Sequence, residues 1–404
     1  GIQFKTLNKK KGRAVWSPRA QVDKRKYENY VLKKIENSGI EVFPGEVVSV
    51  LISKYAVVGV LLRSGEKILT KSVIVTAGTF LSGVVHVGNR KIQAGRMGEE
   101  RAEGLTESLI SEGFKSSRLK TGTPPRLDKN TINWNKTTPT YGDKNPVPFS
   151  YFTGQFCPPN EPCFVINTNK NVHEIIEKNI NRSPMFSGEI EGKGPRYCPS
   201  IEDKVYRFSN RSSHLMFLEP EWMNSDQIYL NGFSTSLPEE AQLSALQKIP
   251  ALSSVSFFRP GYAIEYDFFP PSQLKSSLES KDVSGLFFAG QMNGTSGYEE
   301  AAAQGLVSGI NACLYIENKE PFVLSRSSSY IGVMIDDLIT KDTLEPYRMF
   351  TSRAEFRLML RYSNTFERLL KHASGFNLIS NKKIDLLEKS LCLKNKAKEQ
   401  LNKS

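Results

Sequence analysis

The sequence predicts an α/β protein that binds a ligand at the glycine-rich end of a buried parallel strand. The apolar run Leu286–Ala289 stops at a glycine, as a buried strand of a parallel sheet does. A helix is expected to begin near Tyr298, where Glu299 and Glu300 suit the positive end of the helix dipole. The loop between strand and helix contains Gly290, Gly294 and Gly297. Backbone N–H groups there suit an electron-rich ligand edge, although glycines alone fit an ordinary strand–loop–helix unit equally well.

A second observation supporting this fold class is an antiparallel meander in the first part of the chain. Residues 40–78 alternate in a strand-like pattern, with turns expected at Pro44–Gly45 and Ser64–Gly65. The chain then returns to a buried strand, Ser72 to Thr76. A meander that leads back into a parallel sheet is typical of flavoproteins with two dinucleotide-binding domains. The stretch Thr76–Gly83 is therefore a second place where glycine opens the sheet edge to a ligand.

Length and composition limit the classes of function. A chain of 404 residues is long enough for two or three domains, and its net charge of +12 suits a polyanionic partner. No apolar run approaches the roughly 20 residues of a membrane span. The five cysteines are an odd number, which favours a reducing, intracellular setting over a disulfide framework. The chain starts at Gly1 and ends in a polar helical pattern, so we expect a piece of a longer protein.

The elements between these two strands predict a second, inserted domain. Helices are expected over Val22–Asn37, within 96–113, over His173–Asn179 and over Pro238–Gln247. The rigid run Thr121–Pro125 marks the first domain boundary, and residues 211–280 predict an α/β or α+β fold. Two acidic residues at alternate positions of one predicted strand share a face, Glu265 and Asp267. Paired carboxylates can act as acid and base, but a solvated strand edge is the favoured interpretation.

The segment 191–208 is chemically the richest. Ser200 and Asp203 form a capping-box pair at a predicted helix start. Cys198 comes just before that helix, close in sequence to Arg196 and Lys204, and such an electropositive setting lowers the pKa of a thiol. A buried, inert cysteine is the alternative. A zinc site is not expected, because the remaining cysteines and the histidines lack metal-ligand spacing.

The C-terminal part predicts helices with a basic stripe. Arg353, Arg357 and Arg361 repeat every four residues, beside apolar residues such as Phe356 and Met359. The stripe either binds phosphates or pairs with acidic neighbours such as Glu345 and Glu355 and fixes the tail to the body of the protein.

Several long strings resemble the MnmG/GidA flavoproteins, which are tRNA uridine 5-carboxymethylaminomethyl modification enzymes. The two signature motifs of that family are matched by GPRYCPSIEDK, residues 194–204, and by AGQMNGTSGYEEAAAQG, residues 289–305. RLKTGTPPR, RPGYAIEYDFF, GVMIDDLIT and EPYRMFTSRAEFRLMLR also fit, so the resemblance covers nearly the whole chain. The strings TGTPPR and EPYRMFTSRAE separate this family from the related tRNA-uridine methyltransferase TrmFO.

The resemblance implies a glutathione-reductase-like FAD domain with an inserted second α/β domain and the start of an α-helical C-terminal domain. The FAD domain is expected at residues 1–120 and 281–318, the inserted NAD-binding or substrate domain at 121–280, and the helical domain at 319–404. The implied cofactors are FAD, NADH as reductant and methylene-tetrahydrofolate as one-carbon donor. The implied partners are tRNA and an MnmE-type GTPase in a heterotetramer, with a homodimer, no membrane and a cytoplasmic (or mitochondrial matrix) location.

The resemblance also implies site residues. Those matching FAD contacts are Val47, Ala102 (often serine in relatives), Gly290, Gln291 and Gly294. Those matching the family's proposed NAD-contacting segment are Gly194, Pro195, Arg196, Tyr197, Cys198, Pro199, Ser200, Ile201, Glu202, Asp203, Lys204, Val205, Tyr206, Arg207 and Phe208. Within that segment Cys198 matches the functional cysteine. The candidates for tRNA backbone contact are Arg118, Lys120, Arg126, Arg353, Arg357 and Arg361.

Two departures from the family leave alternatives open. The family's N-terminal glycine-rich fingerprint and most of its helical C-terminal region are absent from the sequence. Because the fingerprint helix holds the FAD pyrophosphate, we expect the chain alone to bind FAD poorly. The alternatives are a folate- and FAD-dependent tRNA uridine-5-methyltransferase, and a non-catalytic fragment that binds tRNA or a partner.

Overall fold

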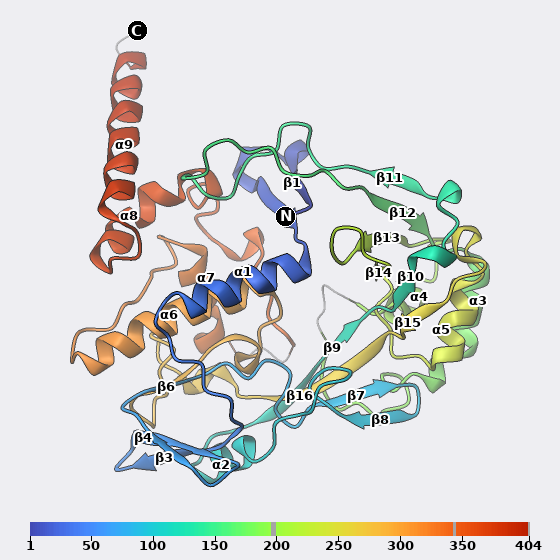
Figure 1. The fold of residues 1–404 in the computed structure, drawn as a ribbon, viewed down its shortest axis with the longest axis horizontal. Helices are drawn as coiled ribbons and strands as arrows, with labels where there is room; N and C mark the ends of the chain where they lie inside the picture. The colour runs from blue at the N-terminus through green and yellow to red at the C-terminus, as the bar shows by residue number, and fades with distance from the viewer. Residues whose placement is uncertain (195–198, 342–344, 403–404) are drawn as a thin grey trace.

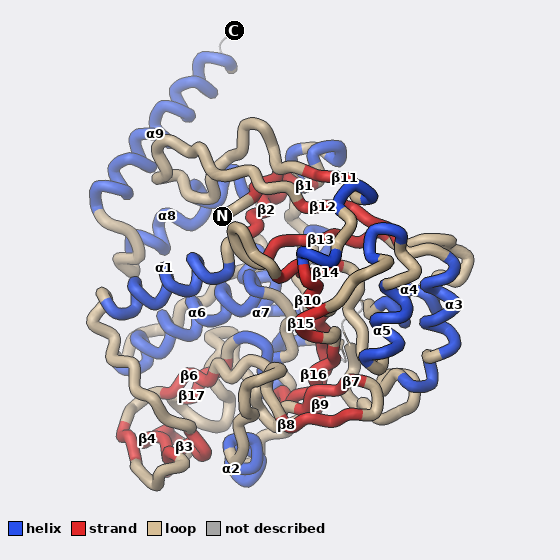
Figure 2. Tube along the Cα trace, turned by 45° about the vertical axis from the view of Figure 1, so that its right-hand side comes forward, coloured by secondary structure: helices blue, strands red, loops and turns tan. Residues whose placement is uncertain are grey.

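The computed structural model describes residues 1–194, 199–341 and 345–402. Figures 1 and 2 show sheets that follow one another across the molecule, with helices at their sides and a helical tail projecting at the C-terminus. No helix in this described part of the chain combines the length and apolar character needed to cross a bilayer.

The parallel strand pair and the meander form as the sequence predicts. Strand β17 (Leu286–Phe288) pairs in parallel with β6 (Val73–Val75), so that Leu286 lies opposite Val73. The antiparallel meander is β3 (Val47–Ser53), β4 (Ala56–Leu62) and β5 (Lys67–Leu69). The turn at Ser64–Gly65 is confirmed, whereas the turn predicted at Pro44–Gly45 is wrong. The chain instead reverses at Lys54 and Tyr55, both of which have positive φ, as a tight hairpin turn requires.

The helices around this pair bury its apolar side chains. Helix α6 (Tyr298–Ile316) begins at the predicted residue, and it is joined by α2 (Leu105–Ser111) and α7 (Tyr330–Thr340). One core cluster contains side chains of β6, β17 and all three helices, among them Leu286, Phe288 and Val307. The glycine loop after β17 is therefore attached to a strand that is packed within an apolar core.

The inserted part of the chain contains an antiparallel sheet in the order β11-β12-β13-β14-β10-β15. The strands are β10 (Arg126–Asp128), β11 (Thr138–Thr140), β12 (Cys163–Asn167), β13 (Leu215–Pro220), β14 (Gln227–Asn231) and β15 (Phe257–Arg259). The helices α3 (Lys170–Lys178), α4 (Ile201–Arg207) and α5 (Glu239–Leu246) pack on this sheet around a separate core. Strand β9 (Ser117–Thr123) runs into the predicted boundary at Thr121–Pro125.

A four-stranded antiparallel sheet lies between these two parts, in the order β8-β7-β16-β9. Its remaining strands are β7 (Val84–Val87), β8 (Arg90–Gln93) and β16 (Tyr262–Phe268). The solvated edge predicted for Glu265 and Asp267 is wrong. Strand β16 lies between β7 and β9, and all seven of its residues are buried. The two carboxylates tolerate burial because Arg118 on β9 faces both of them.

The two ends of the chain lie outside these sheets. The N-terminal hairpin is β1 (Gln3–Leu7) and β2 (Ser17–Gln21), followed by α1 (Lys24–Glu36). The tail ends in α8 (Thr365–Gly375) and α9 (Asn381–Leu401). The predicted helical stripe of Arg353, Arg357 and Arg361 is wrong. In 345–361 the only regular helix is the single 3-10 turn Thr351–Arg353, and the rest of the stretch is extended or forms isolated turns, such as the one in which Leu360 N donates to Phe356 O.

The inserted part also contains a buried pair of histidines. The rings of His173 and His214 lie 5.2 Å apart, and His173 Nε2 lies 2.8 Å from Thr168 Oγ1. Burial lowers the pKa of both histidines below the ordinary value of 6.5, and the neighbouring charges of Lys204 and Arg211 lower that of His214 further. Both are therefore buried in their neutral form.

We predict that this pair makes the protein less stable as the pH falls below about 6.5. In that range the unfolded chain binds protons that the folded chain does not, so the free energy of unfolding decreases. Urea denaturation followed by circular dichroism between pH 7.5 and 5 measures the slope. The substitution His214→Gln should flatten it, whereas His372→Gln on α8 should not. An unchanged slope in His214→Gln would contradict the assignment.

Candidate functional site

The carboxyl ends of β6 and β17 bring two glycine-containing loops together. Because the strands are parallel and in register, both chains leave the sheet at the same edge, one through Gly78 and the other through Gly290. A Cβ atom placed on Gly78 would lie only 3.8 Å from Oε1 of Gln291. Gly290 has a φ of 87°, a conformation that a residue with a side chain rarely adopts. The predicted residues Gly290 and Gln291 therefore lie beside the stretch Thr76–Gly83, the second place where a ligand was predicted to reach the sheet edge.

A buried glutamine holds the glycine loop in shape. Gln304 on α6 is fully buried, and its Oε1 accepts hydrogen bonds from Gly290 N (3.2 Å) and Asn293 Nδ2 (2.9 Å). Its Nε2 donates to Thr295 Oγ1 at 2.9 Å, and Thr295 Oγ1 donates to the Gly290 carbonyl at 2.9 Å. The loop is thus preorganised. Sequence reasoning missed Gln304, because a glutamine within an alanine-rich helix gives no local signal of what it binds.

Two polar atoms beside this loop are buried without a hydrogen-bond partner among the described residues, Tyr266 OH and Asn293 Oδ1. Burial raises the pKa of Tyr266, and Gln291, which is close to it, only partly offsets the effect. Buried polar groups in folded proteins are nearly always satisfied, so an unsatisfied donor and acceptor beside a glycine loop point to a ligand. The arrangement suits a flat, electron-rich ring that meets backbone N–H groups at its edge.

The other predicted contacts, Val47 and Ala102, pack against the apolar core and are next in sequence to residues that line an open cleft of about 650 Å³. Its lining includes their chain neighbours and two basic side chains: Val48, Arg63, Ser82, Arg101, Glu103, Gly104 and Glu107. Ala102 is fixed by two backbone hydrogen bonds, donating to Phe80 O at 2.9 Å and accepting from Ser82 N at 3.0 Å. The sequence neighbours of the two predicted residues therefore line one cleft, although they come from distant parts of the chain.

The described residues on either side of the predicted cysteine are held by hydrogen bonds. Lys193 pairs with β9, and its carbonyl accepts from Lys120 N at 3.1 Å. On the other side the predicted capping box is confirmed, because Ser200 Oγ accepts from Asp203 N at 3.1 Å and Asp203 Oδ2 accepts from Ser200 N at 3.3 Å. The predicted residues Pro195, Arg196, Tyr197 and Cys198 lie outside the described residues. The electropositive setting of Cys198 stays a prediction.

Helix α4 presents few of the residues predicted to contact NAD. Ile201, Glu202 and Val205 are almost completely buried in the core of the inserted part. Tyr206, Arg207 and Phe208 are exposed. A dinucleotide at this helix would meet the exposed end rather than the buried face, and its binding there stays a prediction.

The basic residues predicted to bind nucleic acid around β9 have internal partners. Arg118 Nη1 lies 2.6 Å from Asp267 Oδ1, and Arg126 Nε lies 3.1 Å from Glu221 Oε1. The Lys120 side chain is only 5% exposed, with Nζ 2.5 Å from Met185 Sδ. A phosphate would have to compete with these contacts.

The three C-terminal arginines differ from one another in the partners that they have within the protein. The guanidinium of Arg353 lies over the Tyr347 ring at 4.2 Å, and its Nε donates to Arg348 O at 2.9 Å. Arg361 Nη1 donates to Leu358 O at 2.8 Å, whereas Arg357 is exposed. The neighbour expected to pair with the stripe, Glu355, instead binds Arg326. Of the three, Arg357 is the one positioned to meet a ligand from solvent.

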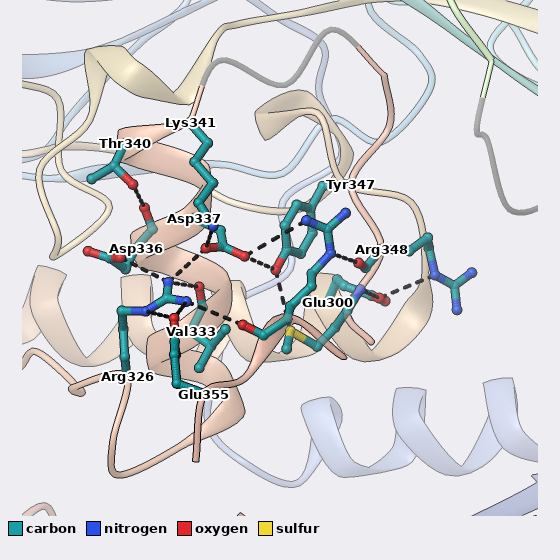
Figure 3. Close-up of polar contacts among 12 residues, drawn as sticks. Glu300, Arg326, Val333, Asp336, Asp337, Thr340, Lys341, Tyr347, Arg348 and Glu355 are labelled. Carbon is teal, nitrogen blue, oxygen red and sulfur yellow. Dashed lines mark hydrogen bonds and ion pairs between the residues drawn. The ribbon is translucent and has the colours of Figure 1, made fainter. Parts of the chain in front are cut away.

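The tail is attached to the glycine loop through a buried carboxylate that sequence reasoning missed (Figure 3). Asp337 on α7 is fully buried and accepts from Lys341 Nζ (2.6 Å), Arg326 Nη1 (2.7 Å) and Tyr347 OH (3.0 Å). Burial opposes its ionisation, but these hydrogen bonds outweigh burial and lower its pKa. Tyr347 N in turn donates to Gly294 O at 2.7 Å. The one available signal was an acidic pair within the apolar string GVMIDDLIT.

No group of three His, Cys, Asp or Glu residues in the described ranges has the arrangement of a metal site. Cys163 is buried and donates to Gln21 Oε1 at 2.9 Å, and burial raises the pKa of its thiol to about 11. It is thus a structural cysteine.

The fold and this site define a class of protein: an α/β protein with an inserted antiparallel domain. Two glycine-containing loops lie together at the carboxyl ends of its parallel strands β6 and β17, and we call this site the glycine edge. The similarity of the chain to known proteins gives the family. A family model described as glucose inhibited division protein A matches residues 1–320. The chain belongs to the glucose-inhibited division protein A (GidA/MnmG) family, which confirms the predicted resemblance.

Relatives and solved structures agree with this assignment. The "tRNA uridine 5-carboxymethylaminomethyl modification enzyme MnmG" of Karelsulcia muelleri is 51% identical over 400 residues, which cover 99% of this chain and 65% of the relative. That of Chlorobium phaeobacteroides is 52% identical, covering 93% and 61%. The crystal structure of GidA from Aquifex aeolicus matches with a TM-score of 0.94 at 47% identity, covering 99% of this chain and 68% of that one. The predicted fold class is confirmed, and the chain spans 61–65% of the length of these two relatives.

We predict that Asp337→Asn destabilises the protein by about 3 kcal/mol, because it leaves Arg326 and Lys341 without their buried partner charge. The adjacent Asp336 is the matched control. It also binds Arg326, at 2.9 Å, but its side chain is 44% exposed. Asp336→Asn should cost less than about 1 kcal/mol. Chemical denaturation of the two variants at pH 7 measures the difference in their free energies of unfolding. Equal losses of stability would show that the burial of Asp337 contributes nothing to the stability of the protein.

Proposed function

We propose that this chain forms the FAD- and substrate-binding part of an enzyme that adds a carboxymethylaminomethyl group to C5 of the wobble uridine in tRNA. The observation that carries the proposal is the glycine edge shared by β6 and β17, with the unsatisfied atoms Tyr266 OH and Asn293 Oδ1 beside it. Further support comes from two relatives, 51% and 52% identical in sequence, that are named for this modification.

The residues present fit FAD. Gly290, Gln291 and Gly294 would hold the flavin ring, and Val47 and Ala102 would lie near its adenine end beside the cleft, whose charged lining residues are two arginines and two glutamates. When bound, FAD supplies the redox chemistry, with NADH as reductant and methylene-tetrahydrofolate as source of the one-carbon unit. The Gln304 network would keep the loop in one conformation, so that no reorganisation accompanies binding.

Cys198 would activate the uridine. C5 of uracil is a weak nucleophile. When a thiolate adds to C6, the C5–C6 π electrons become an enolate that attacks the electrophilic one-carbon unit through C5. Loss of the C5 proton and expulsion of the thiolate then restore the double bond, so the cysteine is regenerated. In this proposal Arg196 and Lys204 keep the thiol ionised.

A net charge of +12 supports tRNA as the substrate, since phosphate contacts provide most of the affinity for a nucleic acid. Arg357 is the best placed of the predicted phosphate contacts, because it is exposed. An MnmE-type GTPase as partner, a homodimer and a cytoplasmic location belong to the same proposal.

We predict that Gln291→Ala weakens flavin retention in the protein at the full length of its relatives, because a contact to the ring is lost. The visible absorbance of flavin that remains after gel filtration measures it. The matched control is Gln93→Ala on the exposed strand β8, which should retain flavin as the unsubstituted protein does. Full retention by Gln291→Ala would place the flavin elsewhere.

We predict that Cys198→Ser abolishes tRNA modification while flavin is retained, because a hydroxyl is a far weaker nucleophile than a thiolate. Mass spectrometry of nucleosides from tRNA incubated with the full-length protein, its GTPase partner and all cofactors gives the product. Cys392→Ser on α9, an exposed position, is the matched control. Modification that survives in Cys198→Ser would contradict the role, and 5-methyluridine as product would indicate a methyltransferase.

A further inference from the structure

Besides Gln304 on α6, a residue near the start of the tail holds the glycine loop. Tyr347 N donates to Gly294 O at 2.7 Å, and Ser296 N donates to Tyr347 O at 2.9 Å. Tyr347 is thereby paired in parallel with Thr295, and we call this pairing the loop clamp. Gly294 has a φ of 74°, a conformation that glycine enters and leaves readily. The loop therefore depends on partners outside itself to keep one shape.

The residues that follow Tyr347 bind the helix after the loop. Met349 N donates to Glu300 Oε1 at 2.9 Å, and Arg348 Nε lies 3.2 Å from the same oxygen. Glu300 is in the first turn of α6 and only 3% exposed. Three successive residues of the segment thus contact the loop or the start of α6, which fixes the segment along its length and not at a single point.

The Tyr347 side chain connects the loop clamp to α7 (Figure 3). It is only 1% exposed, and its OH donates to Asp337 Oδ2 at 3.0 Å. Burial and the nearby Asp337 carboxylate raise the pKa of Tyr347 above its ordinary value of 10.0, so the hydroxyl keeps its proton and remains a donor. Asp337 is itself fixed by Arg326 and Lys341. One hydroxyl therefore joins the segment to a charged cluster that loses buried ion pairs when it moves.

We propose that Tyr347 is a positioning residue for the flavin ring: its hydroxyl, held by Asp337, keeps its backbone on residues 294–296 and so maintains the loop conformation that receives the cofactor. Tyr347 acts through the loop and not by contact with the reacting atoms. The consequence for flavin rests on the proposed function, whereas the loop clamp does not.

The test separates this role from a contribution to the core. Tyr347 belongs to the apolar core beneath the sheet, so the substitution must keep its ring. Tyr347→Phe removes only the hydroxyl. Tyr330→Phe on α7 is the matched control, because Tyr330 OH is buried and has no hydrogen-bond partner among the described residues. Ile335→Val, which shortens a buried side chain of α7 in the same core as Tyr347, is the control for stability.

The first readout is hydrogen exchange at single backbone amides in the protein at the full length of its relatives, without FAD. Mass spectrometry with electron-transfer fragmentation resolves the Ser296 amide, whose acceptor is Tyr347 O. We expect Tyr347→Phe to accelerate exchange at Ser296 about tenfold, as the loss of one hydrogen bond to a charged group implies. Neither control should change it, because the loop opens locally without unfolding of the core.

The second readout is the release of FAD from the loaded protein after dilution, followed by the fluorescence of the freed flavin. We expect release from Tyr347→Phe to be about tenfold faster, because release of the ring requires the same opening of the loop that exchange at Ser296 measures. Tyr330→Phe and Ile335→Val should release FAD at the rate of the unsubstituted protein.

The role would be overturned by a folded Tyr347→Phe protein in which exchange at Ser296 is unchanged. Faster exchange with unchanged release of FAD would also overturn it, since the loop would then not hold the ring. So would equal effects in Tyr330→Phe, or in Ile335→Val at the same loss of unfolding free energy, because the cause would be a weakened core. If exchange responds as expected but the unsubstituted protein binds no FAD, the loop clamp stands and the proposed function fails.

Discussion

The parallel pairing of β6 with β17 is the constraint on which the site depends. Three residues on each strand, far apart in the sequence, align in register and deliver Gly78 and Gly290 to one edge of the sheet. Neither loop forms a site alone. The core beneath them, with Leu286, Phe288 and Val307, removes enough apolar surface from water to make this short pairing rigid. Hydrogen bonds that Gln304 accepts from Gly290 N and Asn293 Nδ2 then give the loop one conformation, which a ligand meets without further ordering.

Buried carboxylates fix two loops of the described structure. Glu265 holds the backbone of Glu191 and Gly192, and Asp337 holds Tyr347, which in turn binds the glycine loop. Apolar packing tolerates sliding between surfaces, whereas a buried anion with two or three donors has one favourable geometry and a large penalty for losing it. The protein thus uses apolar cores to build its sheets and charged contacts to direct its loops.

The segment 345–350 joins the tail to the glycine loop more closely than a flexible connection would. Tyr347 pairs with Thr295, and Glu300 at the start of α6 accepts from Met349 N at 2.9 Å. The tail is therefore in direct contact with the loop where the flavin is proposed to lie.

The sequence by itself determined the features that depend on near neighbours in the chain. Four features follow from residue period and local hydrogen bonding, and all were predicted: the meander, the parallel strand, the start of α6 at Tyr298 and the Ser200–Asp203 capping box.

The tertiary structure alone decided which charges are buried and where they bind. Glu265 and Asp267 were expected in solvent because alternation shows that they share a face, not that β7 and β9 enclose it. The prediction of a helical arginine stripe was wrong for a similar reason: a period of four favours a helix, but Arg353 is held by contacts with Asp337, Tyr347 and Arg326, which lie elsewhere in the fold or the chain. Burial depends on elements that are distant in the chain, so no local pattern encodes it.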